Sequence, residues 1–188
     1  MKGRTTGIII LTAATAAAVV IAYAIGINPS AANVAGAFVS IVIMVIVTKI
    51  IKVDDTLFYS GLVFIFMASP LGSIIDLYRF VGPYDKIVHF ISGFLLAAFG
   101  MFIIEKLLKR TSKVEDLKPF VIPMIFTACM FSSGGAGLWE IFEFLADKIA
   151  GGGMQRGMVD TVTDMIAGNI GALVYGVVTL KQVSNKHR

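Results

Sequence analysis

Six apolar runs, each about as long as a lipid bilayer is thick, constrain the fold of this chain more than any other feature. They cover residues of about 7–26, 31–51, 56–76, 86–108, 119–146 and 158–180. A membrane-spanning helix needs about 20 mostly apolar residues, so the runs leave almost no length for a soluble domain. The sequence therefore predicts an all-α protein, a polytopic transmembrane bundle of about six helices that forms a single integral membrane domain over residues 1–188.

The composition agrees with a multi-pass protein of the cell membrane. Hydrophobic residues make up 57% of the chain and charged residues only 15%, with a net charge of +4. Such values lie outside the range of ordinary soluble domains. The basic residues occur in short groups between the apolar runs, which does not indicate a nucleic-acid partner. The expected partner is the lipid bilayer. The single cysteine, Cys129, allows no intramolecular disulfide and is predicted to be a small buried thiol.

The distribution of Lys and Arg predicts the orientation of the spans. If the N-terminus is cytoplasmic, twelve of the sixteen basic residues fall in cytoplasmic segments. Basic residues are enriched on the cytoplasmic side of membrane proteins. Both termini are therefore predicted to be cytoplasmic, with the loop at 147–157 outside. Alternatively, the first run is a cleaved signal peptide, which would leave the other spans as they are.

Acidic residues gather at the predicted outer ends of the later spans. Helical spacing of three or four residues places side chains on one face and predicts three polar pairs: Asp85 with His89, Glu140 with Glu143, and Asp160 with Asp164. The three pairs lie at similar depth, so the last three spans are predicted to be neighbours there. Clustered carboxylates cannot all be ionised in a low-dielectric pocket and require protons, basic partners or a metal.

These pairs predict a divalent-metal site. Carboxylate oxygens with an imidazole suit Mg, Mn, Fe or Zn. The predicted ligands are His89, Glu140, Glu143, Asp160 and Asp164, with Asp85 or a spare carboxylate as general base. The alternative is simple solvation or ion pairing of acids at helix ends, as expected for Asp76 with Arg79. Asn169 lies on a different face from Asp164 and is predicted to bridge helices.

Small residues and one proline predict how the spans pack. Pro70 removes a helical hydrogen bond, so a kink or break is expected in the third span. The glycine-rich run at 132–137 in the fifth span is either a break that lines a cavity or a close-packing surface. Gly93, Ala97 and Gly100 in the fourth span, and Gly168, Ala172 and Gly176 in the sixth, are predicted packing seams.

The motifs of residues 82–176 resemble a known family. They are Asp85-Lys86-Ile87-Val88-His89-Phe90, Glu140-Ile141-Phe142-Glu143, and Gln155 followed by Asp160-Thr161-Val162-Thr163-Asp164-Met165 with Gly171-Ala172. The pattern resembles the YjdF-like prokaryotic membrane proteins and, more distantly, the VanZ-like proteins, which share the Asp-Lys-x-x-His-Phe helix start. The resemblance implies a helical membrane protein with a polar site, and for VanZ-like relatives a link to glycopeptide tolerance. It implies no specific reaction.

Three functions remain open. The first is a metal-dependent enzyme that acts on an envelope or lipid-linked substrate by hydrolysis or group transfer. The second is a cation- or proton-coupled transporter, although transporters usually carry their polar groups at the bilayer midplane and on broken helices. The third is a non-catalytic structural or interaction protein.

Overall fold

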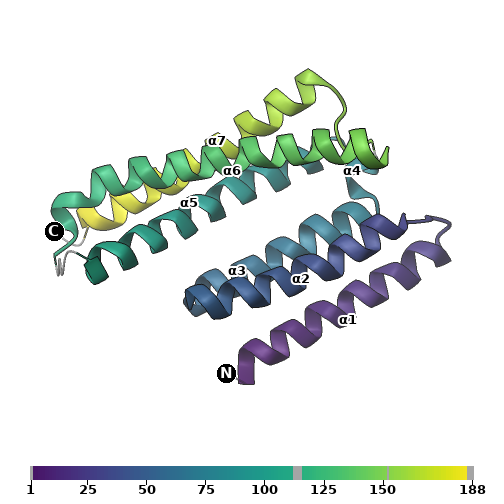
Figure 1. Ribbon diagram of the computed structural model, residues 1–188, viewed down its shortest axis with the longest axis horizontal. Helices are drawn as coiled ribbons and strands as arrows, with labels where there is room; N and C mark the ends of the chain where they lie inside the picture. The colour runs from purple at the N-terminus through teal and green to yellow at the C-terminus, as the bar shows by residue number, and fades with distance from the viewer. Residues whose placement is uncertain (1, 112–115, 152, 186–188) are drawn as a thin grey trace. The chain divides into compact units, whose positions relative to one another are not determined.

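The computed structural model describes residues 2–111, 116–151 and 153–185. Its elements are α1 (Lys2–Ala24), α2 (Ala31–Ile51), α3 (Asp55–Phe66), η1 (Met67–Ile74), α4 (Leu77–Phe80), α5 (Tyr84–Thr111), η2 (Lys118–Phe120), α6 (Val121–Ala150) and α7 (Met158–Asn185) (Figure 1). Within the described ranges there are no strands, and six helical segments are long and apolar enough to cross a membrane. The prediction of an all-α, six-span membrane protein is confirmed. The predicted cytoplasmic position of the termini stays a prediction.

Local sequence signals fix several helix ends. Ser30 and Asp54 precede α2 and α3, and their side chains accept hydrogen bonds from the backbone N–H groups of Asn33 and Leu57. Such caps satisfy N–H groups that have no partner inside the helix. Gly151 ends α6 with φ of 68°, a left-handed conformation that glycine adopts without steric cost. The connections between spans are therefore encoded locally.

The described contacts form two compact units, Met1–Val88 and His89–Arg188. The division falls inside α5, which is one unbroken helix from Tyr84 to Thr111. Asp85 and His89 are therefore held one turn apart by the same helix, although they are assigned to different units. The prediction of a single integral membrane domain stays a prediction.

The first unit packs α1, α2 and α3 around apolar side chains. Phe58 and Ile74 are almost completely buried, at 1% and 0% exposed. The predicted disturbance at Pro70 takes the form of η1, a π-helix that continues α3. The wider π-helical turn accommodates the missing proline N–H without ending the helix. The predicted local pair between Asp76 and Arg79 is present at 4.0 Å.

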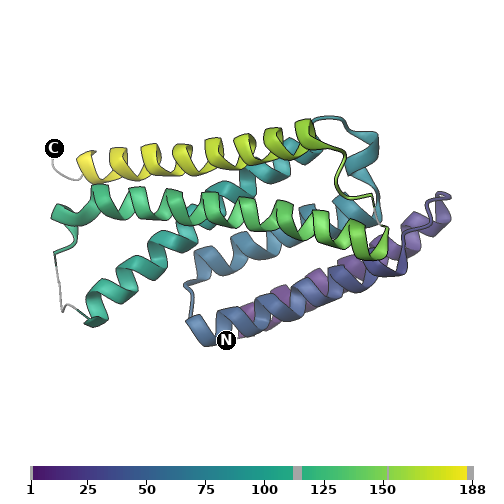
Figure 2. The ribbon, with the colours of Figure 1, turned by 45° about the horizontal axis from the view of Figure 1, so that its top comes forward.

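The second unit packs α5, α6 and α7 side by side, as the two ribbon views show (Figure 1, Figure 2). The predicted seams are the contact surfaces. A Cβ added to Gly93 on α5 would lie 1.8 Å from the carbonyl oxygen of Gly168 on α7, and a Cβ on Gly171 would lie 2.0 Å from the carbonyl oxygen of Phe90. Glycine at these positions therefore lets the two backbones touch.

The glycine-rich run of the fifth span is a packing surface and not a break. Helix α6 continues through it from Val121 to Ala150. Ser132, which is fully buried, donates a hydrogen bond of 2.9 Å to the Gly93 carbonyl of α5. Ser133 donates to the Oδ1 atom of Asn169 on α7. The prediction that Asn169 bridges helices is confirmed.

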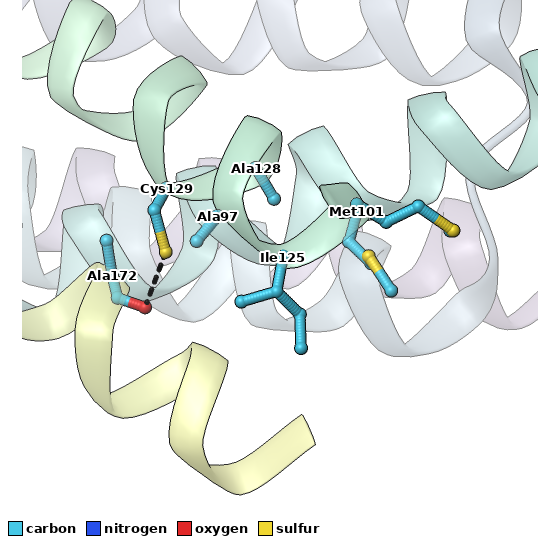
Figure 3. Packing of buried hydrophobic residues seen from close by; sticks show 7 residues of the cluster. Ala97, Met101, Ile125, Ala128, Cys129 and Ala172 are labelled. Atoms are coloured by element: carbon cyan, nitrogen blue, oxygen red, sulfur yellow. Dashed lines mark hydrogen bonds between the residues drawn. The ribbon is translucent and has the colours of Figure 1, made fainter. Parts of the chain in front are cut away.

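The apolar core of the second unit lies farther along the same helices. Ala97 and Met101 of α5, Ile125 and Ala128 of α6, and the Cys129 thiol surround one another (Figure 3). The thiol points to α7, and its Sγ lies 3.5 Å from the Ala172 carbonyl oxygen. The prediction of a small buried thiol at Cys129 is confirmed.

Candidate metal centre

The candidate site lies where the first turns of α5 meet those of α7. The His89 Nε2 atom is 3.7 Å from an Asp164 carboxylate oxygen. The close backbone contacts at Gly93 and Gly171 hold the two helices together one to two turns farther along. Asp164 is 2% exposed and His89 8%. The structure thus brings together two of the polar pairs that the sequence placed at similar depth.

Asp85 completes a group of three potential ligands. One atom each from Asp85, His89 and Asp164 lies within 4.8 Å of the others, and all three residues are buried. Because metal–ligand bonds of about 2 Å allow two ligand atoms on one ion to be about 4 Å apart, this spacing suits one bound ion. Asp85 also lies 3.7 Å from the Lys86 ammonium. Asp85, which the sequence predicted as general base, therefore lies close enough to His89 and Asp164 to bind the same ion.

Glu140 of α6 is the fourth ionisable residue of the site and its third acid. It is 5% exposed, and neither carboxylate oxygen has a hydrogen-bond partner among the described residues. The carboxylate is close enough to His89, Asp164 and Asp160 to interact with each electrostatically, and the Thr161 hydroxyl lies beside it. An ionised carboxylate buried in this way is costly unless a cation or a proton compensates its charge.

Glu143 and Asp160, the other two predicted ligands, have different surroundings. The Glu143 carboxylate accepts a hydrogen bond of 2.7 Å from the Trp139 indole N–H one turn earlier. The Asp160 carboxylate lies 3.3 Å from the Arg156 Nε atom. Neither is in the three-residue group of possible ligands. The i, i+3 and i, i+4 spacing predicted that both members of each acidic pair share a helix face, but in the structure one carboxylate of each pair is buried and the other lies nearer the surface.

Thr161 and Gln155 belong to the surroundings of the site, although sequence reasoning gave them no role. The Gln155 side-chain amide donates to the Thr161 hydroxyl at 3.1 Å. The backbone N–H groups of Gln155 and Met154 in turn donate to the Asp147 carboxylate. Thr161 lies three residues before Asp164, so the same helical spacing could have placed it on the face of the cluster.

The fold and the buried group define a class: a multi-pass helical membrane protein with a carboxylate–histidine cluster among its spans. The chain belongs to the family described as "Predicted membrane protein (DUF2238)", whose model matches residues 7–185.

A relative from Thermotoga maritima, described as "Uncharacterized protein", is 28% identical over 123 residues. The match covers 65% of this chain and 60% of the relative, so the chain matches less than two thirds of that protein's length. No solved structure matches the chain.

Proposed function

We propose that Asp85, His89 and Asp164 bind one divalent metal ion and that the site acts on an envelope or lipid-linked substrate by hydrolysis or group transfer. The observation that carries the proposal is the buried carboxylate of Glu140 beside this group, with no hydrogen-bond partner among the described residues. A cation compensates both this charge and the mutual repulsion of the acids. Carboxylate oxygens with one imidazole suit Mg, Mn, Fe or Zn.

The site residues divide into two roles in this proposal. Asp85, His89 and Asp164 would hold the ion, which would supply Lewis acidity to the reaction. Glu140 accepts the proton of the attacking water or hydroxyl group, because its buried carboxylate interacts electrostatically with His89 and Asp164 of the group. This assignment moves the general base from Asp85 to Glu140. Asp160, paired with Arg156, lies beside Glu140 at the more exposed edge of the site.

Metal binding is tested by comparing three proteins in detergent: the native chain, Asp164→Asn and the control Asp55→Asn. Asp55 pairs with Arg4 at 2.6 Å and is three-quarters exposed, so its amide variant changes an acid outside the cluster. The native protein and the control are expected to be stabilised by added Mg, Mn, Fe or Zn and destabilised by chelator, whereas Asp164→Asn responds to neither. A native protein indifferent to every ion and to chelator contradicts the proposal.

The reaction is tested separately with Glu140→Gln. The native protein is expected to release a water-soluble product from radiolabelled envelope lipids, and the variant to retain metal binding but release none. Metal binding by the native protein without any turnover would favour the non-catalytic alternative. Cation flux into proteoliposomes would favour transport, a function that the unbroken course of α6 and its hydrogen-bonded Ser132 do not support.

The side of the membrane that the site faces decides which substrates reach it. The basic-residue distribution predicts the outer side. Gly152 of the predicted outer loop lies outside the described residues, so the test uses its neighbour Met154→Cys in a Cys129→Ser background. Labelling by an impermeant maleimide from outside intact cells is expected. Labelling only after the cells are opened would place the site on the cytoplasmic side.

The family assignment is consistent with the YjdF-like resemblance of the motifs. The more distant relation to VanZ-like proteins, with its link to glycopeptide tolerance, stays a prediction. Both resemblances involve the residues of the cluster and neither supplies a substrate.

A further inference from the structure

A cavity of about 410 Å³ lies in the second unit, away from the metal centre. It is bounded by the later turns of α5 and α7 and by η2 with the start of α6. Its volume is within the range of pockets that bind small ligands. None of its lining residues belongs to the carboxylate–histidine cluster.

The lining is mostly apolar, and its charged side chains, Glu105 and Lys118, lie toward the ends of the spans, where apolar residues such as Leu117 also line it. On α5 it extends from Phe94 to Glu105, which corresponds to about 16 Å at 1.5 Å per residue. Phe94, Met101 and Met124 line the deeper part, and both methionines are buried. Met101 appears in the close view of the core (Figure 3).

The polar side chains of the lining include Glu105, Lys118 and Gln182, which lie close to where α5 and α7 end and η2 begins. Span ends lie at the interface between lipid headgroups and water. The cavity thus has the polarity of an amphiphile whose tail points into the bilayer.

We propose that this cavity binds one acyl chain of a phospholipid whose headgroup carries both a phosphate and a primary ammonium. Lys118 contacts the phosphate and Glu105 accepts hydrogen bonds from the ammonium. Among the described residues, the cavity lining offers one basic and one acidic side chain, which is complementary to a zwitterion. The Lys109 ammonium lies 4.0 Å from the Glu105 carboxylate, a long contact that leaves acceptor capacity on Glu105.

The headgroup, and not the chain, sets the specificity of this site. An acyl chain is surrounded by apolar groups both in the bilayer and in the cavity, so its transfer provides little selectivity. A primary ammonium donates three hydrogen bonds. A quaternary ammonium donates none, and a glycerol headgroup carries no positive charge. Phosphatidylethanolamine is therefore the best-matched common phospholipid.

Native mass spectrometry of the purified full chain tests this assignment. The protein in detergent is mixed with equal amounts of phosphatidylethanolamine, phosphatidylcholine and phosphatidylglycerol that carry the same chains. Retention of phosphatidylethanolamine is expected to exceed that of the other two by about tenfold, the effect of one charge-assisted hydrogen bond. Equal retention of all three lipids overturns the proposal.

Three variants and one control locate the site. Val178→Trp fills the cavity and is expected to abolish retention of all three lipids. Glu105→Gln is expected to remove the preference over phosphatidylcholine, and Lys118→Gln to weaken retention of all three. The control, Lys106→Gln, changes a lysine that lies over the Phe102 ring and does not line the cavity, and it is expected to behave as the native protein.

The charge variants keep the test decisive if Val178→Trp fails to fold. A native preference that is unchanged in both Glu105→Gln and Lys118→Gln overturns the proposal. So does a preference for phosphatidylglycerol that depends on Lys118 alone. Neither result bears on the metal centre, whose variants and ion titrations involve other residues.

Discussion

Helices α1 to α3, continued by η1, and helices α5 to α7 are all apolar enough to span a membrane, but the two groups bury different chemistry. The first three bury apolar side chains such as Phe58 and Leu62, and the buried Thr15 hydroxyl bonds to the carbonyl of Leu11 in its own helix. The last three bury His89, Glu140 and Asp164. Burying charged groups costs free energy that apolar packing does not. The difference places the buried ionisable groups named here in the last three spans, where the proposed metal site lies.

The two groups of helices also differ in how closely their backbones approach. A Cβ on Gly61 of α3 would meet the flexible methyl end of Met44 at 2.9 Å, whereas one on Gly93 of α5 would meet backbone at 1.8 Å. A side-chain end can move aside at little cost, but a helix backbone cannot. The α5–α7 contact at Gly93 therefore fixes the distance between two helix backbones close to His89 and Asp164. The contact at Gly61 involves a flexible side chain and fixes no such distance.

The largest expected effect comes from breaking the α5–α7 contact. Gly93→Ala is expected to lower the free energy of unfolding by about 3 kcal/mol, the upper part of the usual range for overpacking, and to weaken metal binding by separating His89 from Asp164. The control is Gly134→Ala on α6, where an added Cβ meets nothing within 4 Å. Thermal unfolding in detergent measures both. Equal melting temperatures for the two variants would show that the contact is not constraining.

A cavity in α3 is expected to reduce stability without affecting the metal. Phe58 is 1% exposed, so Phe58→Ala leaves a void. The loss is expected to be about 2 kcal/mol, below the 3–5 kcal/mol typical of soluble proteins, because unfolded helices remain in lipid and the transfer contribution is small. Ion titrations should give native affinity. A matching loss of affinity would mean that the two groups of helices are functionally coupled.

Removing one interhelical hydrogen bond is expected to have a smaller effect. Ser132→Ala removes the bond to the Gly93 carbonyl and should cost about 0.6–1 kcal/mol, as interhelical bonds in membranes do. The control is Thr127→Ala on the same helix, since the exposed Thr127 hydroxyl donates to the Pro123 carbonyl one turn earlier in its own helix. A difference in melting temperature between the two variants measures the interhelical bond. No difference would assign the α5–α6 contact to packing alone.

The smallest expected effect is at the Arg4–Asp55 pair of α1 and α3. The Arg4 guanidinium also donates to the Val53 carbonyl and lies over the Phe58 ring. Because Asp55 is largely exposed, Asp55→Asn is expected to cost less than about 1 kcal/mol. The difference between native and variant melting temperatures should shrink at high salt. A loss of unfolding free energy above about 2 kcal/mol that does not change with salt would contradict this expectation, because it would mean that water and ions do not screen the Arg4–Asp55 attraction.

The sequence by itself determined the spans and the polar helix faces. Both depend on local properties: twenty apolar residues make a span whatever surrounds them, and residues three or four apart share a helix face. For this reason the six spans, the small-residue seams and the pairing of Asp85 with His89 on one helix could all be predicted.

Only the tertiary structure decided which member of each acidic pair is buried. Glu140 is buried while Glu143 bonds to Trp139, and Asp164 faces His89 while Asp160 pairs with Arg156. The rotation of each helix about its own axis makes this choice, and it is set by contacts between residues far apart in sequence, such as Gly93 with Gly168. Spacing along one helix contains no information about that rotation, so the sequence could place the acids at one level but could not say which of them meet.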